Sequence, residues 1–219
     1  MSDELIHKTE TSDWLFLKVA NADFEEEQNI DEHLNTKNVN IKKTIGGESS
    51  QNAKDAQNSD HHKSVVSFKW VEIKNDEFFL KYIQGLLPHT KKIEKVEFEL
   101  NDADKVNPNF LIVEDFNTTG IDGNDADDKS NYFGFWRNLG VSSKKRDKGG
   151  GRGLGRTVYA IASKLRCFFA LSNTVDDNPD YFMGVFLGSP HSFENKRYKA
   201  NARYCNFDRN SEDPKFNPI

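Results

Sequence analysis

The sequence predicts an α/β fold of the α+β type, a two-layer sandwich in which helices pack on one face of a mixed β-sheet. Three observations lead to this prediction. Residues 65–73 are rich in β-branched and aromatic side chains, which is typical of a strand. Apolar residues recur at helical spacing from Phe78 to Leu87, where Pro88 is expected to stop the helix. Phe110–Val113 is a short continuous apolar run, as expected for a central strand covered on both sides.

Composition favours one domain and excludes several classes of protein. The chain has 219 residues, enough for one sizeable hydrophobic core, and a formal net charge of -5 at pH 7 with basic residues dispersed among acidic ones. Cys167 and Cys205 lie beside aromatic residues rather than at metal-binding spacing, so we expect reduced thiols in a cytoplasmic protein. No apolar run approaches the roughly 20 residues that cross a bilayer, and the first residues are acidic and polar.

The chain is expected to divide into three parts. Residues 1–43 form a partly ordered N-terminal extension, residues 44–205 form the domain, and residues 206–219 form a flexible tail. Inside the domain, residues 93–100 alternate between apolar and polar side chains and predict a strand. Two further strands are predicted at Cys167–Leu171 and Tyr181–Leu187.

A long polar, glycine-bearing segment between the predicted strands indicates a lid. Residues 117–150 lack clear periodicity, and structureless segments of such length in compact domains are often functional. Aromatic residues interrupt it at Tyr132–Trp136. They are expected either to pack the lid onto the body or to contact a protein partner.

Residues 46–63 are almost entirely polar, and composition alone predicts a loop there. Glu48 and Asn52 are four positions apart, so they would share one face of a helix if one formed. A carboxylate and a carboxamide so placed can reach the same metal-bound phosphate. The alternative is that both are ordinary polar residues on a solvated loop.

The glycine cluster Gly149–Gly155 indicates phosphate binding, and three patterns compete for it. Gly150–Thr157 resembles a P-loop but has Arg156 in place of the lysine, and the polar residues before it do not form a buried strand. The dinucleotide fingerprint fails in register and also needs a preceding strand. The remaining pattern is a lid ending in glycines, whose backbone amides face phosphates at the start of the following helix.

Taken in order, these motifs resemble those of the GHKL superfamily, the Bergerat-fold ATPases that include DNA gyrase, MutL, the histidine kinases and the heat-shock chaperone of the ninety-kilodalton class. Glu48 to Asn52 resembles the family's N-box. Ile112–Asp115 resembles the strand whose aspartate binds the adenine amino group, and the segment Gly151–Gly155 resembles the glycine box that ends the ATP lid. The resemblance covers about residues 40 to 190.

The resemblance implies ATP and Mg²⁺ as cofactors and assigns a role to each motif. Glu48 would be the general base, Asn52 the Mg²⁺ ligand through its carboxamide oxygen, and Asp115 the adenine-binding residue. Asn117 stands where the family has a glycine, so the turn after Asp115 departs from the family pattern. Cofactor-binding positions beyond Asp115 would be Asn117, Gly120, Gly151, Gly153, Leu154, Gly155 and Arg156.

The expected function is Mg²⁺-dependent ATP binding with slow ATP hydrolysis, acting as a conformational switch in a larger assembly or a longer chain. The alternative is a non-catalytic nucleotide-binding or protein-interaction module with a degenerate GHKL site. The histidine-kinase branch is disfavoured because no helix with a phosphoacceptor histidine precedes the N-box. Expected partners are a second copy in an ATP-dependent homodimer and a protein bound through the lid. The basic stretch Lys144–Lys148 leaves nucleic acid open as a further partner.

Overall fold

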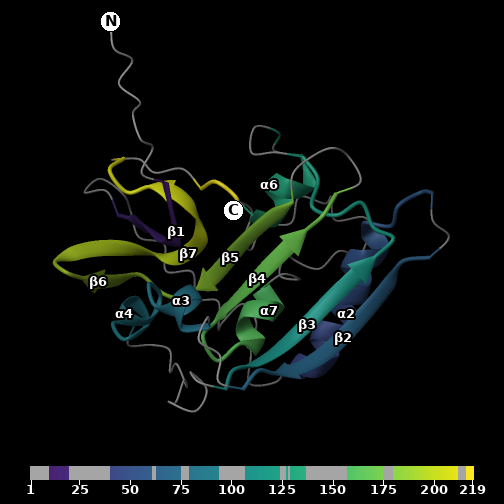
Figure 1. Ribbon diagram of the computed structural model, residues 1–219, viewed down its shortest axis with the longest axis horizontal. Helices are drawn as coiled ribbons and strands as arrows, with labels where there is room; N and C mark the ends of the chain where they lie inside the picture. Colours follow the sequence, from purple (N-terminus) through teal and green to yellow (C-terminus); the bar gives the residue numbers. More distant parts are fainter. Residues whose placement is uncertain are drawn as a thin grey trace, which may run out of the picture.

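The computed structural model describes residues 10–19, 40–60, 63–74, 79–93, 107–123, 127, 129–136, 157–174, 180–211 and 216–219. These residues form helices and antiparallel sheets, so the α+β class is confirmed (Figure 1). The elements in chain order are β1 (Glu10–Lys18), α2 (Ile41–Asp55), β2 (Val65–Glu72), α3 (Phe79–Ile83), α4 (Leu87–Thr90), β3 (Asn109–Phe116), α6 (Asn131–Trp136), α7 (Thr157–Ala162), β4 (Cys167–Ser172), β5 (Tyr181–Leu187), β6 (His191–Phe193) and β7 (Lys196–Asp208).

The strands of the described residues form two sheets. The larger has the order β1-β7-β5-β4, with β6 paired to β7, and the smaller is the ribbon β2-β3. Every pairing in the described residues is antiparallel, which differs from the expected mixed sheet. Short connections explain the difference, because they join β4 to β5 and β6 to β7 as antiparallel neighbours. The turn between β6 and β7 holds Glu194 and Asn195 at φ 48° and 58°, as a tight hairpin requires.

The five-stranded sheet is covered on both faces, which differs from the expectation of helices on one face only. Alternate residues of β5 point to opposite sides. Met183, Val185 and Leu187 pack with residues of α6 and α7, whereas Phe186 packs with residues of α3 and the segment leading to α4. Because β5 is apolar at nearly every position, both of its faces have to be removed from water.

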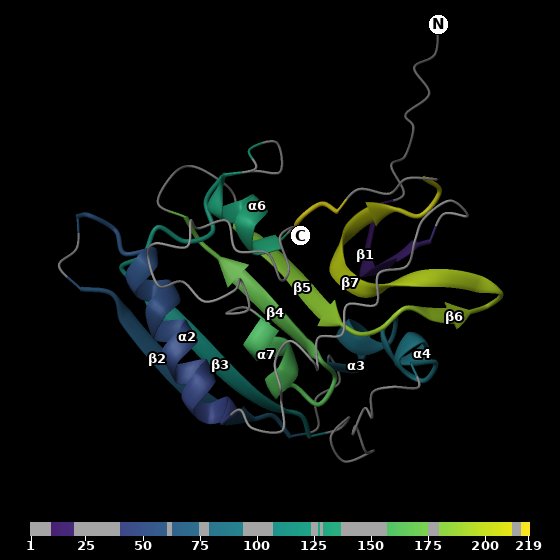
Figure 2. The same ribbon diagram turned by 180° about the vertical axis from the view of Figure 1, so that it is seen from behind.

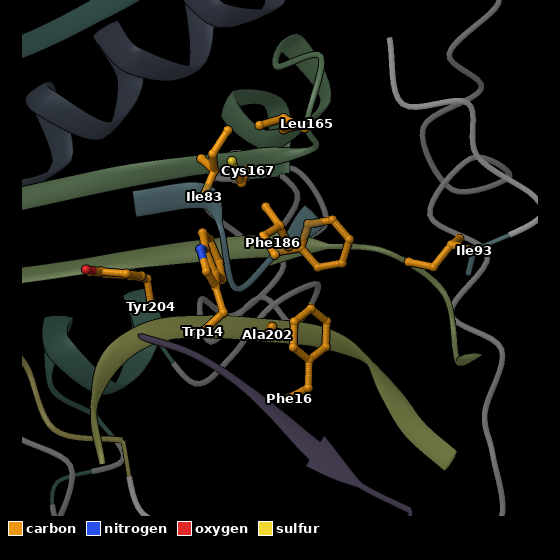
Figure 3. Packing of buried hydrophobic residues seen from close by; sticks show 10 residues of the cluster. Trp14, Phe16, Ile83, Ile93, Leu165, Cys167, Phe186, Ala202 and Tyr204 are labelled. Atoms are coloured by element: carbon orange, nitrogen blue, oxygen red, sulfur yellow. The ribbon is translucent and has the colours of Figure 1, made fainter. Parts of the chain in front are cut away.

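Aromatic rings from strands far apart in the sequence build the first hydrophobic core, on the face of the sheet that carries Phe186 (Figure 3). The second core lies on the face that carries Met183, Val185 and Leu187. Trp14 and Phe16 of β1 approach Phe186 with ring centroids 6.4 and 5.7 Å apart. The indole N–H of Trp14 donates to the backbone oxygen of Tyr82, 2.7 Å away. That hydrogen bond fixes the end of α3 against the sheet.

The ribbon β2-β3 lies where two strands were predicted, but its environment differs from the prediction. Phe110–Val113 was expected to be a central strand covered on both sides, and this expectation is wrong. Large apolar side chains of the ribbon and its margin are exposed: Val65, Phe68, Trp70, Ile73, Leu111, Ile112 and Phe116. The reason is that a two-stranded ribbon has few neighbours, and among the described elements α2 is the one that packs along both strands.

The amphipathic helix predicted from Phe78 to Leu87 is divided into α3 and α4. Pro88 lies in the first turn of α4 rather than ending a helix. Proline suits that place because its fixed φ is helical and its missing N–H would have no partner there. Gly85 lies between the two helices, and a β-carbon at Gly85 would collide with the Asp13 carboxylate.

Both ends of the chain contribute to the five-stranded sheet. β1, which falls in the predicted N-terminal extension, pairs along β7 from Glu10 to Lys18 with one irregularity. In the predicted tail, the Ile219 N–H donates to the Phe182 oxygen at 3.0 Å, and residue Asn217 forms a bridge with Asn206. The predicted strand at residues 93–100 falls, apart from its first residue, outside the described residues. Within the described part of the chain, no helix has the length and hydropathy needed to span a membrane.

Candidate functional site

The segment that composition predicts to be a loop forms the helix α2. Asn40 caps it, because its side-chain oxygen accepts the backbone N–H three residues on at 3.2 Å. Ile45, Ser49 and Ala53 are buried and recur every four residues, forming one stripe of the helix. The stripe faces β2, β3 and α7, so tertiary packing compensates for the weak helix propensity of the segment.

Glu48 and Asn52 flank the buried stripe of α2, and both are partly buried. Between them, the hydroxyl of Ser49 lies 2.8 Å from that of Tyr159 on α7, although these residues are 110 positions apart. Figure 2 shows α2 lying across β2 and β3. The contact between Ser49 and Tyr159 therefore joins α2 to α7 at the predicted N-box.

Tyr159 is a half-buried residue of α7 whose hydroxyl meets α2 at Ser49. Burial raises the pKa of Tyr159, and the negative charges of Asp115 and Glu48 raise it further, against the opposing effect of its hydrogen bonds. The phenol is therefore protonated at neutral pH. The segments that carry these carboxylates lie side by side, because Gln57 directly after α2 forms a bridge with Thr118 in the turn after β3.

The turn after β3 holds Asp115 beside the end of α2. The Asp115 carboxylate accepts the Thr118 hydroxyl at 3.1 Å. Asn117 has a φ of 61°, a conformation that asparagine tolerates better than most residues. Its side chain donates to the Lys63 oxygen at 3.0 Å, and its own oxygen accepts the Asn58 N–H at 3.0 Å.

Gly120 lies where this turn meets the end of β4. It has a φ of 72°, and an added β-carbon would lie 2.9 Å from both the Asn173 oxygen and the Ser172 hydroxyl. The next residue, Ile121, donates its N–H to the Ser172 hydroxyl at 2.8 Å. Ser172 and Thr174 are buried polar residues that the sequence did not single out. Their only signal was a run of polar residues directly after an apolar strand.

The glycine box cannot be placed in the site. Gly151, Gly153, Leu154, Gly155 and Arg156 fall outside the described residues, as does the basic stretch Lys144–Lys148. The helix predicted to follow the cluster is confirmed as α7, which begins at Thr157. The roles proposed for those backbone amides stay predictions.

The aromatic residues of the predicted lid pack onto the body. Tyr132 and Trp136 of α6 are buried in the second core of the large sheet. The Arg203 guanidinium of β7 donates to the Trp136 oxygen from Nε at 3.2 Å and from Nη2 at 2.8 Å. Of the two alternatives for these aromatics, packing onto the body therefore applies to Tyr132 and Trp136.

One side chain of the described site, that of Asn52, is the metal ligand that the motif resemblance implies. Asn52 offers a carboxamide oxygen, a ligand that Mg²⁺ accepts. No group of three histidine, cysteine, aspartate or glutamate side chains that could hold a metal occurs among the described residues.

Two participants in this site, Ser49 and Tyr159, were missed by sequence reasoning. Both lie on the apolar face of their helix, and nothing in a local pattern indicates that their hydroxyls meet. Comparisons with protein-family models, with curated proteins and with solved structures gave no match to this chain. The resemblance to the GHKL superfamily accordingly rests on the residues of the chain itself.

Proposed function

We propose that this chain binds Mg-ATP and hydrolyses it slowly, acting as a nucleotide-dependent switch in a larger assembly. One observation carries the proposal: the end of α2, which follows Glu48 and Asn52, is hydrogen-bonded to the turn after Asp115, where the Thr119 N–H donates to the Ala56 oxygen at 2.8 Å. The motif order predicts that Glu48, Asn52 and Asp115 serve one nucleotide. On the fold, the proposal extends to a Bergerat-type arrangement, with α2 and α7 placed beside β3 around the nucleotide.

The three residues would divide the work by their chemistry. The Asp115 carboxylate accepts a hydrogen bond from the adenine amino group. The Asn52 oxygen binds the metal, which neutralises charge on the phosphates. The Glu48 carboxylate accepts a proton from the attacking water.

Calorimetric titration with a non-hydrolysable ATP analogue, with and without Mg²⁺, tests nucleotide binding. We expect Mg²⁺-dependent binding by the wild type and at least a tenfold weaker affinity in Asp115→Ala, since a charge-assisted hydrogen bond is worth about 1.5–3 kcal/mol. Asp180→Ala is the control, because Asp180 is an exposed residue directly before β5. Equal affinity of Asp115→Ala and wild type, or no binding by wild type, would contradict the proposal.

Turnover tests the general base separately. Glu48→Ala should bind the analogue as the wild type does and lose ATP hydrolysis, with a rate reduced by about 100-fold or more. Glu72→Ala, at the exposed far end of β2, should hydrolyse ATP at the wild-type rate. Unchanged turnover in Glu48→Ala would remove Glu48 from this role while leaving nucleotide binding intact.

The exposed apolar ribbon favours a second candidate, a protein-interaction module with a degenerate site. Trp70 is 72 % exposed, and its cross-strand partner Leu111 is exposed as well. Contiguous exposed apolar surface marks protein contacts more often than chance. This candidate predicts self-association without nucleotide, which Trp70→Lys would abolish in sedimentation velocity. A monomeric wild type that binds Mg-ATP would reject it.

A further inference from the structure

Residues 216–219, which follow β7 in the sequence, are hydrogen-bonded to two strands of the large sheet. The Asn217 N–H donates to the Asn206 oxygen at 3.0 Å, and the Asn206 N–H donates to the Asn217 oxygen at 2.8 Å. Ile219 makes the same reciprocal pair of bonds with Phe182, at 3.0 and 3.3 Å. This inserted segment therefore holds the end of β7 to the start of β5.

A gap in the pairing of β5 and β7 makes room for the inserted segment. The two strands pair up to Gly184, which lies opposite Tyr204. Two residues further in the same register, Phe182 would lie opposite Asn206. Each of these two residues bonds to the inserted segment instead. The segment is thus inserted at the point where the two strands stop pairing.

The walls of this gap are anchored by the rest of the sheet. Phe182 pairs with Leu171 of β4, and its ring stacks on that of Phe169 with centroids 5.7 Å apart. On the other side of the gap, Asn206 pairs with Ser12 of β1. None of these contacts involves the inserted segment. The walls would therefore stay in place, with their backbone donors and acceptors, if the segment left.

Side chains around the gap favour the sequence of the inserted segment. The Ser12 hydroxyl donates to Oδ1 of Asn206 at 2.6 Å, and the amide N–H of Asn206 donates to the Pro218 oxygen at 3.3 Å. Phe216 packs against the second core, with Cζ of Arg203 6.0 Å from the centre of its ring. Backbone bonds supply affinity for a short peptide, and these side chains select an aromatic residue two positions before a proline.

We propose that the gap between β5 and β7 is a peptide-binding site for residues 216–219 of a second copy of this chain, which the chain's own segment otherwise fills. The second copy is the partner because its segment has the sequence whose fit to the gap is seen in the structure. Exchange of the segment between two copies preserves every contact of the gap and gives a symmetric dimer. The inference is independent of nucleotide binding.

Binding of a labelled peptide with the sequence of residues 211–219 tests the site. The protein is the double variant Phe216→Ala/Asn217→Pro, in which the chain's own segment loses its aromatic ring and a backbone N–H donor. Fluorescence anisotropy should show at least tenfold tighter binding to the double variant than to the wild type, where the tethered segment competes at an effective concentration of about 1 mM.

A peptide with the same two substitutions is the matched control and should bind neither protein. Circular dichroism establishes that the double variant is folded. A folded double variant that does not bind the peptide would overturn the proposal, and so would equal affinities for the two peptides.

Sedimentation velocity tests exchange in the unmodified chain and does not depend on the folding of the double variant. Refolding the wild type from urea at a protein concentration of about 1 mM should give a dimer fraction, and refolding at about 1 µM should give monomer, because exchange competes with the tethered segment. Trp70→Lys should dimerise as the wild type does, which distinguishes exchange from association through the ribbon. A wild type that is monomeric at both concentrations, or loss of the dimer in Trp70→Lys, would overturn exchange between copies.

Discussion

The five-stranded sheet and the ribbon β2-β3 differ sharply in burial. Val185 and Phe186 of the sheet have no exposed surface, whereas Trp70 of the ribbon is 72 % exposed. The sheet is packed on both faces by aromatic and aliphatic side chains. The ribbon packs chiefly against α2, a helix of weak propensity. Resistance to unfolding is therefore expected to reside in the sheet.

The candidate site lies where these two regions meet. α2 and β3 supply Glu48, Asn52 and Asp115, and α7, which packs on β4 and β5, supplies Tyr159. Binding sites are often drawn from the less stable parts of a protein, since those parts can adjust to a ligand. The well-packed sheet thus holds α7, and the ribbon with α2 carries the three residues that the proposed function assigns to the nucleotide.

Truncating a core phenylalanine is expected to have the largest effect. Phe186→Ala removes a ring with no exposed surface that packs against Trp14 and Phe16, and should lower the free energy of unfolding by about 3–5 kcal/mol. Phe68→Ala in the ribbon, where the side chain is 44 % exposed, should cost less than about 1 kcal/mol. Urea denaturation measures both. Similar losses at the two positions would contradict the contrast between the regions.

Adding a single carbon to the sheet should have the next largest effect. A β-carbon at Gly184 would lie 2.8 Å from Cβ of Tyr204 and 2.9 Å from the ring of Phe169. Gly184→Ala should therefore destabilise the fold by about 1–3 kcal/mol through overpacking. Thermal unfolding followed by circular dichroism measures the loss. A melting temperature unchanged from wild type would mean that this face of the sheet is less tightly packed than the contacts indicate.

The contact between α4 and the β6-β7 hairpin should make stability depend on pH. Burial, and secondarily His191 at 2.7 Å, lower the pKa of His89 from 6.5 to about 4. The folded protein thus favours neutral His89. The contribution of His89 to the free energy of unfolding is fully present above pH 6.5 and is lost as the pH falls from 6.5 towards 4. Because His89 is partly exposed, the loss is expected to be on the order of 1 kcal/mol.

Urea titrations at a series of pH values measure this dependence. In the wild type, the ring of Phe16 stacks on that of His89 with centroids 3.8 Å apart. His89→Phe keeps a ring in this place and removes the titrating group. The variant should show a flatter pH profile over the same range. A profile as steep as that of the wild type would assign the dependence to other groups, among them His191, whose pKa is also lowered by burial.

The smallest effect, and one of opposite sign, is expected in α2. A β-carbon at Gly46 meets no atom within 4 Å, so Gly46→Ala should stabilise the protein by about 0.5–1 kcal/mol through helix propensity alone. Amide hydrogen exchange of α2 should slow accordingly. A loss of stability would show that α2 needs its glycines for a reason other than space.

Several elements were predictable because their cause is local. β2 and β5 follow from runs of β-branched and aromatic residues, and α7 follows from helical spacing after the glycine cluster. The division between α3 and α4 was missed, since the preference of Pro88 for a first turn competes with its ability to end a helix. α2 was predicted as a loop by composition and as a helix only through the motif resemblance.

By itself, the sequence determined the α+β class and most of the strands, because strand and helix periodicities are short-range properties, and its motif spacings predict the three polar residues of the candidate site. Only the tertiary structure decided that β1 pairs with β7, that the ribbon is exposed, and that Tyr159 and Ser49 meet between α7 and α2. Each of these depends on which surfaces bury one another. Such burial is a property of the folded chain and is absent from any local pattern of residues.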